Sequence, residues 1–249
     1  MRIDDNWSRE ALDIIKDIDY NVLIPTLNRR YSYNELKEFD LVATSTTGDD
    51  HLELRDIPFI SLKGETAFLK DVWATAEMTM ALMLSLVRRI PAAFDDVKRG
   101  HWNRDAFQGN ELHGKTLGIV GLGRVGRQVA KFAEVFGMKV IWHDPYIAKS
   151  EHNTIPDYCR IDREQNDLLR ESDIVTVHVP LDDSTRGMFG AEQFRQMKPT
   201  AYFINTSRGQ VVEEDALIWA LKNKIIAGAA LDVIHNEPNI NPALLEYAK

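Results

Sequence analysis

One short run of glycines constrains the fold of this chain more than any other feature. Gly121, Gly123 and Gly126 form the pattern G-x-G-x-x-G, which follows an apolar run, residues 116–120, and opens a stretch with helical spacing, residues 124–136. The first glycine allows a tight turn, the second lets the backbone approach a pyrophosphate, and the third lets the helix lie close to the strand. Free amides at the helix start favour negative charge. The pattern predicts a strand, turn and helix that bind a dinucleotide.

An acidic residue supports this prediction and indicates which dinucleotide is bound. Asp144 directly follows the next strand-like run, residues 139–143, at about the 20-residue distance expected after the glycine motif. An acid at that place accepts hydrogen bonds from the adenine ribose hydroxyls and repels the extra phosphate of NADP. An acid at a strand end can also be a merely structural residue, but here the strand, glycines, helix and acid are in register. NAD is favoured over NADP.

The second half of the chain alternates between strand-like and helical segments. Such alternation with apolar strands predicts a doubly wound parallel sheet covered on both faces. The expected strands are residues 116–120, 139–143, 174–179, 201–204 and 227–233, and the expected helices are 124–136, 162–171, 191–197 and 213–223.

The first half predicts a smaller α/β domain followed by long helices. The expected helices are residues 7–16 and 32–38, with strands at 21–24, 41–44 and 57–62. A long helix is expected over 71–89, and a second one from Pro91 to Gly100, because proline suits a first turn and glycine a helix end. We therefore expect two unequal domains, residues 1–70 and 71–249.

Charge and cysteine content exclude several classes of partner. The net charge of −8 argues against nucleic acid and anionic membranes, since both need a basic face. The longest strongly apolar stretch, residues 78–87, is too short to span a bilayer, and the acidic N-terminus has no secretory core. Cys159 is the single cysteine, so no disulfide can form within the chain. An inert thiol and a cytoplasmic location are expected.

Further candidate site residues follow the later strands, at the edge of such a sheet where ligands bind. The first group is His178-Val179-Pro180-Leu181 with Thr185, and the second is Asn205-Thr206-Ser207-Arg208-Gly209. Arg208 could hold a carboxylate with two parallel hydrogen bonds, or it could be a surface residue paired with Glu213 or Glu214. Asp232 and Glu237 follow the last strand, and either could be a solvated turn acid.

These motifs, in this order, resemble the D-isomer-specific 2-hydroxyacid dehydrogenases, and within them the phosphoglycerate dehydrogenase-like members. The resemblance runs from about Leu41 to Leu245 through GLGRVG, WHDPY, HVPL, NTSRG and ALDVIHNEP. It implies a Rossmann domain that also mediates dimerisation, beside a flavodoxin-like substrate domain that is incomplete here. It implies an NAD-dependent enzyme that moves a hydride between NAD(H) and a small D-2-hydroxy or 2-keto acid, 3-phosphoglycerate included, with no metal.

The resemblance also assigns roles to individual residues. Arg208 would bind the substrate carboxylate and carbonyl oxygen, and Glu237 would orient and charge a catalytic histidine. The loop Thr46-Thr47-Gly48 would offer backbone amides to the substrate carboxylate. The predicted cofactor-binding residues are Gly121, Gly123, Arg124, Val125, Gly126, Asp144, His178, Pro180, Thr185, Thr206, Ser207, Arg208 and Asp232.

The chain departs from the family pattern at two places. The family's histidine lies some twenty-odd residues beyond the acid that Glu237 matches, and the sequence stops at Lys249. His235 lies near Glu237 but does not occupy that position. Between Pro25 and Leu41 there is room for one helix, where the family places an extra strand and helix.

Three functions remain open from the sequence. The first is a fragment of a working oxidoreductase, inactive by itself because the histidine segment is missing. The second is a non-catalytic NAD(H)-binding dimer, a sensor or corepressor-like module. The third, a reductase that uses NADP, is disfavoured by Asp144. The presence of both Arg208 and Glu237 favours the first, since binding NAD alone requires neither.

Overall fold

The computed structural model describes residues 21–25, 29–147, 155–159 and 161–247, and the chain divides into two compact units, Met1–Asp71 and Val72–Lys249. The helix expected over residues 7–16 lies outside the described residues.

The Met1–Asp71 unit contains a small parallel sheet. Its strands are β1 (Val22–Leu23), β2 (Leu41–Ala43) and β3 (Phe59–Ile60), in the order β1-β2-β3, and its helices are α2 (Tyr33–Leu36) and α3 (Thr66–Leu69). Val42 of β2 joins Leu36 and Leu52 in a buried cluster. The strand expected over 57–62 is shorter, because the Ile57 N–H donates to the Leu54 carbonyl in a turn and pairing with β2 begins only at Phe59.

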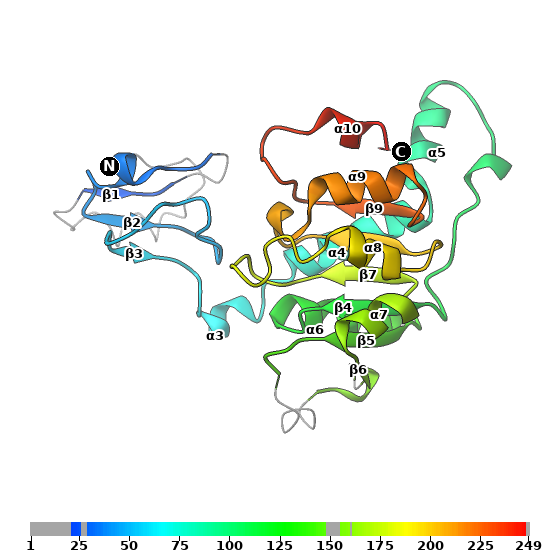
Figure 1. Ribbon diagram of the computed structural model, residues 1–249, viewed down its shortest axis with the longest axis horizontal. Coiled ribbons are helices and arrows are strands. Elements are labelled where there is room, and N and C mark those ends of the chain that lie inside the picture. The colour runs from blue at the N-terminus through cyan, green and yellow to red at the C-terminus, as the bar shows by residue number, and fades with distance from the viewer. Residues whose placement is uncertain (1–20, 26–28, 148–154, 160, 248–249) are drawn as a thin grey trace. The chain divides into compact units, whose positions relative to one another are not determined.

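The Val72–Lys249 unit contains a six-stranded parallel sheet in the order β6-β5-β4-β7-β8-β9 (Figure 1). Counted from β4, this is the order 3-2-1-4-5-6 of dinucleotide-binding sheets, and the order reverses between β4 and β7. The doubly wound parallel sheet is therefore confirmed. The strands are β4 (Thr116–Val120), β5 (Lys139–His143), β6 (Ile161–Asp162), β7 (Ile174–Val177), β8 (Tyr202–Asn205) and β9 (Gly228–Leu231).

Helices cover both faces of this sheet. One face is packed by α4 (Ala74–Val87) and α6 (Arg124–Val135), and the other by α7 (Gln165–Glu171), α8 (Ala191–Gln196) and α9 (Glu214–Lys222). The remaining elements are α5 (Ile90–Lys98), α10 (Pro242–Leu245) and the 3-10 turns η1 (Asp105–Phe107), η3 (Asp157–Cys159) and η4 (Gly209–Val211). No helix among the described residues has the length and apolar character needed to cross a membrane.

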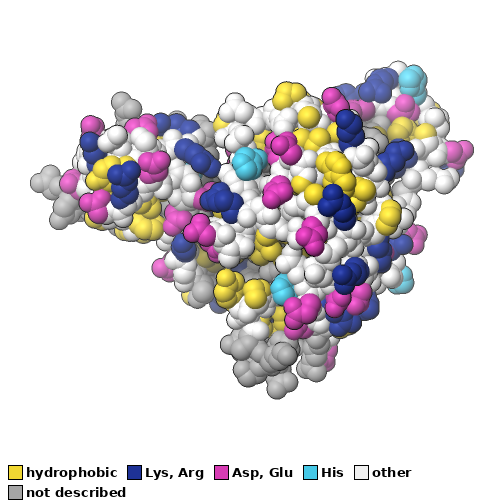
Figure 2. All heavy atoms as spheres, viewed as in Figure 1, with side chains coloured by type: hydrophobic (Ala, Val, Ile, Leu, Met, Phe, Trp, Pro, Cys, Tyr) yellow, Lys and Arg dark blue, Asp and Glu magenta, His cyan; other side chains and the backbone are white. Residues whose placement is uncertain are grey.

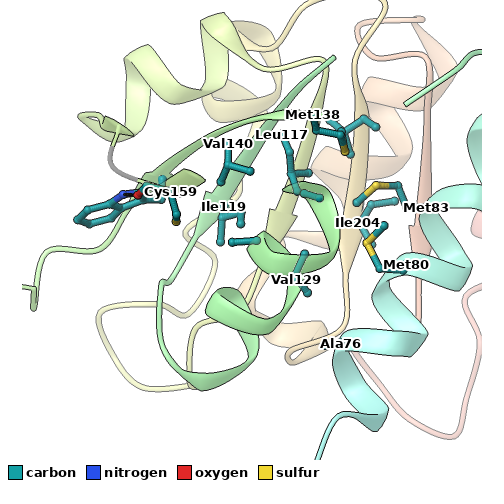
Figure 3. Close-up of a cluster of buried hydrophobic side chains, with 14 of the residues drawn as sticks. Ala76, Met80, Met83, Leu117, Ile119, Val129, Met138, Val140, Cys159 and Ile204 are labelled. Atoms are coloured by element: carbon teal, nitrogen blue, oxygen red, sulfur yellow. Dashed lines mark hydrogen bonds between the residues drawn. The ribbon is translucent and has the colours of Figure 1, made fainter. Parts of the chain in front are cut away.

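Two buried clusters hold the helices to the sheet. Successive side chains of a strand point to opposite faces, so Leu117 and Ile119 of β4 join the α4 and α6 cluster in Figure 3, and Val120 joins the other. Buried Trp142 donates from Nε1 to the Cys159 carbonyl at 2.6 Å. Cys159 is buried, and burial raises the pKa of its thiol to about 11, which favours an inert thiol.

Several element boundaries differ from the sequence-based expectation. The helix expected over 162–171 begins only at Gln165, because Ile161 pairs with Ile141 as an edge strand. The helix expected over 71–89 begins at Ala74 and ends before Arg89, whose left-handed backbone (φ 55°) separates α4 from α5. Gly100, with φ 83°, follows the end of α5 as expected.

Candidate functional site

The turn after β4 lies where the strand order of the sheet reverses. Gly121 has φ 92°, its N–H donates to the His143 carbonyl at 2.9 Å, and a β-carbon there would stand 2.8 Å from the His178 carbonyl oxygen. A β-carbon on Gly126 would overlap the Gly121 carbonyl oxygen. At Gly123, in contrast, a β-carbon would meet nothing within 4 Å. The turn is therefore tight at its two ends and open at its centre, as a pyrophosphate-binding backbone requires.

The first turn of α6 supplies backbone donors beside this open space. Gly123 is the N-cap, so the N–H groups of Arg124 and Val125 have no acceptor within the helix. The Arg124 guanidinium does not turn back to the glycines, because its Nη1 donates to the Val72 carbonyl at 2.7 Å. We therefore expect Arg124 and Val125 to bind phosphate through the backbone.

Asp144 lies against the glycine turn. Its Oδ2 accepts a hydrogen bond from the Leu122 N–H at 2.9 Å, and its Oδ1 accepts one from the Tyr146 N–H at 3.0 Å. The carboxylate thus links the end of β5 to the turn after β4. This position suits an acid that meets the adenine ribose of a dinucleotide whose phosphates lie at the glycines.

The residues after β7 line the other side of the same turn. The His178 N–H donates to the Val120 carbonyl at 2.8 Å, and its Nε2 lies 3.0 Å from the Thr176 hydroxyl. Burial lowers the pKa of His178 to about 3, so the imidazole is neutral near pH 7. Pro180 is exposed, and the buried Thr185 hydroxyl donates to its carbonyl at 2.6 Å. The Thr185 hydroxyl therefore stabilises the conformation of the loop after β7.

The loop after β8 carries three predicted site residues. The Thr206 hydroxyl lies 2.9 Å from the Thr79 hydroxyl of α4, and the Ser207 hydroxyl donates to Asn205 Oδ1 at 2.8 Å. Arg208 is half-buried, and its Nη1 donates to the Ser207 carbonyl at 2.8 Å. The hydroxyls of Thr206 and Ser207 thus bond within the protein, and only Arg208 brings a cationic group to this loop.

The segment after β9 lies beside the Arg208 loop. The Asp232 N–H donates to the Asn205 carbonyl at 3.0 Å, and its carboxylate is exposed. Gln210 Nε2 donates to the His235 carbonyl at 3.1 Å, which ties the two segments together. Glu237 is exposed, and its Oε1 accepts from the Ile234 N–H at 2.9 Å.

The predicted substrate loop belongs to the Met1–Asp71 unit and follows β2. The Thr46 hydroxyl donates to the Gly48 carbonyl at 2.7 Å, and the Thr46 carbonyl accepts from the Leu62 N–H at 3.0 Å. Thr47 is exposed. The loop is a hydrogen-bonded turn, and its role in substrate binding stays a prediction.

Two residues that hold the Arg208 loop were assigned no role from the sequence, one at the end of β8 and one in α4. Asn205 and Thr79 received no role, although both are buried and bond to predicted site residues. An asparagine directly after an apolar strand is a recognisable turn signal, because its side chain commonly bonds the backbone two residues on. Nothing in the local sequence of α4 indicates the contact of Thr79. Within the described ranges, no three His, Cys, Asp or Glu side chains gather as metal ligands would.

Comparisons with known proteins agree with this geometry. Residues 80–249 match the family model described as "D-isomer specific 2-hydroxyacid dehydrogenase, NAD binding domain". The chain is 38% identical over 237 residues to a D-3-phosphoglycerate dehydrogenase of Methanocaldococcus jannaschii, covering 95% of this chain and 45% of that protein. It is 37% identical over 247 residues to a glyoxylate reductase of Thermococcus litoralis, covering 94% of this chain and 72% of that protein.

A solved structure shows the same likeness. The D-lactate dehydrogenase of Aquifex aeolicus, complexed with NAD and lactic acid, superposes with a TM-score of 0.73 at 28% sequence identity, covering 90% of this chain and 70% of that one. The chain spans less than half the length of the D-3-phosphoglycerate dehydrogenases that it matches. Its Val72–Lys249 unit contains the NAD-binding domain, and the chain belongs to the D-isomer specific 2-hydroxyacid dehydrogenase family.

Proposed function

We propose that this chain is the cofactor-binding part of an oxidoreductase that transfers a hydride between NAD(H) and a small D-2-hydroxy or 2-keto acid. The observation that carries the proposal is Arg208, the guanidinium on the loop after β8, beside the strand ends that build the dinucleotide turn. A dinucleotide site alone needs no cation at that place. A 2-keto acid does, because it brings a carboxylate and a carbonyl oxygen that becomes negative during reduction.

Each part of the cofactor and substrate has a candidate binding residue. The open backbone at Gly123 and the amides of Arg124 and Val125 fit a pyrophosphate, and Asp144 fits the adenine ribose. Bound NADH supplies the hydride. Arg208 would hold the carboxylate and counter the charge that develops on the carbonyl oxygen. Glu237 would hold a histidine that exchanges the hydroxyl proton, in the position that the family resemblance implies.

His178 is an unsuitable proton donor for this reaction. Its imidazole is neutral near pH 7, since burial lowers its pKa to about 3, and its Nε2 faces the Thr176 hydroxyl. We assign it to the wall of the cofactor site. His235 is half-buried, and its backbone joins the two loops through Gln210.

The substrate class is tested with the complete gene product. We expect NADH oxidation with glyoxylate, with hydroxypyruvate or with its 3-phosphate, and the ratio of the kcat/KM values identifies the preferred acid. Use of the phosphorylated acid alone would make the protein a phosphoglycerate dehydrogenase. Tight NADH binding without turnover of any 2-keto acid would contradict the oxidoreductase and favour a sensor.

We propose that the protein is a homodimer through the segment from α4 to η1. Large apolar side chains are exposed along it, among them Ile90, Phe94, Val97 and Trp102, the last with 86% of its surface exposed. Exposed apolar clusters of this kind are typical of subunit contacts. Sedimentation equilibrium should give twice the chain mass, and a monomer at micromolar concentration would contradict this assignment.

We further propose a cytoplasmic location with no nucleic-acid partner. Acidic and basic side chains are mixed over the face drawn in Figure 2. The net charge of −8 suits neither a phosphate backbone nor an anionic membrane. Fractionation of cells that express the complete gene product tests the location.

A further inference from the structure

Asn205, the last residue of β8, holds the loop that carries Arg208. Its side chain is almost fully buried, with 1% of its surface exposed. Oδ1 accepts two hydrogen bonds, from the Ser207 N–H at 3.0 Å and from the Ser207 hydroxyl at 2.8 Å. Nδ2 donates to the Arg208 carbonyl at 2.9 Å. One carboxamide therefore fixes the backbone on both sides of the peptide that leads into Arg208.

The orientation of this carboxamide is set by its partners. The Ser207 N–H can only donate and the Arg208 carbonyl can only accept, so an exchange of Oδ1 and Nδ2 would place donor against donor and acceptor against acceptor. Aspartate has the same shape but no donor. It would leave the Arg208 carbonyl facing a carboxylate oxygen, and the loop would have to move.

Neighbouring contacts make the loop rigid on its other sides. The Thr79 hydroxyl of α4 bonds the Thr206 hydroxyl at 2.9 Å, and both side chains are buried. A β-carbon on Gly209 would overlap the Ile234 carbonyl, so the backbone after Arg208 lies directly against the next segment. The guanidinium itself bends back to the Ser207 carbonyl. The direction of the Arg208 side chain thus depends on the backbone of residues 207–208, which the Asn205 carboxamide fixes through hydrogen bonds.

We propose that Asn205 is a positioning residue that sets the direction in which Arg208 presents its guanidinium to the substrate. The inference rests on the proposed function, since it needs Arg208 to bind the 2-keto acid. Asn205 touches neither substrate nor cofactor in this scheme. Its effect on the reaction passes through Arg208, and this dependence separates it from a residue that only stabilises the fold.

The test is a double-mutant cycle in the complete gene product with glyoxylate as the 2-keto acid. Asn205→Asp and Asn205→Ala are made in the Arg208 background and again with Arg208→Lys. In the Arg208 background we expect kcat/KM to fall by roughly tenfold to a hundredfold, the size of effect that a misplaced positioning group has. With Arg208→Lys in place, the same substitutions should change kcat/KM less than about threefold, because the group that they misplace is already lost.

Controls keep a folding effect apart from a positioning effect. Ser172→Ala removes another buried side-chain bond, from the hydroxyl to the Leu168 carbonyl, outside the site, and it should leave kcat/KM unchanged in both backgrounds. If both Asn205 variants fail to fold, Ser207→Ala removes only the hydroxyl bond at 2.8 Å and should show the same dependence on Arg208 with a smaller loss.

The outcomes separate the two claims. If the Asn205 substitutions lower kcat/KM by the same factor with Arg208→Lys as with Arg208, the positioning role is overturned and the proposed function stays intact. Full kcat/KM in Arg208→Lys alone would overturn the proposed function, and the positioning role with it. A large loss that is confined to the Arg208 background supports both.

Discussion

Replacing Gly121 with alanine should destabilise the Val72–Lys249 unit by about 1–5 kcal/mol, the sum of three contributions. The φ of 92° costs a residue with a β-carbon about 1–2 kcal/mol. The β-carbon would lie 2.8 Å from the His178 carbonyl oxygen and 3.0 Å from Val179 Cγ1, and overpacking of this kind costs roughly 1–3 kcal/mol. Alanine also lowers the entropy of the unfolded chain, which offsets about 0.4–1 kcal/mol.

Urea denaturation followed by circular dichroism measures this change, and a thermal melt should fall by about 2–4 °C for each kcal/mol. Gly123→Ala is the matched control, because a β-carbon there meets nothing within 4 Å and its φ is −72°. That variant should keep its stability but bind NADH more weakly, since its methyl group takes space that a pyrophosphate needs. Unchanged stability in Gly121→Ala would refute the steric reasoning, and unchanged NADH affinity in Gly123→Ala would remove the pyrophosphate from this turn.

The remaining predictions concern Asp144, Arg208 and His178. In a fluorescence titration, Asp144→Ala should weaken NADH binding and reduce the difference between the affinities for NADH and NADPH. An unchanged preference for NADH would remove Asp144 from the site. Arg208→Lys in the complete gene product should lose most of its kcat/KM for glyoxylate, because an ammonium lacks the guanidinium fork, and surviving activity would refute the role of Arg208. The folded-state pKa of His178 lies near 3, below the ordinary value of about 6.5, so the unfolded chain binds the extra proton and stability should fall as pH decreases from 6.5 towards 3. His178→Gln should show a smaller loss between pH 7 and pH 5 in urea denaturation, and an equal loss would assign the pH dependence to other groups.

The sequence predicted the centre of the sheet better than its edges. The strands expected over 116–120 and 139–143 are confirmed as β4 and β5, because continuous apolar residues are typical of parallel strands buried on both faces. At the edge, β6 has only two residues, Ile161 and Asp162, and one of them is charged. Its pairing depends on β5 beside it rather than on its own side chains. A local pattern cannot show such a dependence. The helix α7 was therefore expected from residue 162, although it begins at Gln165.

The candidate site was also predicted only in part. Residues at strand ends could be predicted, because all parallel strands present their carboxyl ends at one edge. The direction of each polar side chain could not, because it depends on partners that are distant in the chain. Thr206 was expected at the cofactor, yet its hydroxyl bonds to Thr79 in α4, a residue whose own helix gives no sign of it. Asn205 stood in a recognised loop, but only the three bonds of its carboxamide reveal what it holds.

The candidate cofactor-binding residues follow the ends of β4, β5, β7, β8 and β9 and run from Gly121 to Asp232. A ligand that contacts all five ends can bind only when the whole sheet is formed. Thermodynamic linkage then adds the binding free energy to the stability of the fold, about 2.7 kcal/mol when free ligand is a hundredfold above its Kd. The concentration of free dinucleotide would then set part of the resistance of this unit to unfolding and proteolysis, and a fall in cofactor concentration would shorten the lifetime of the protein.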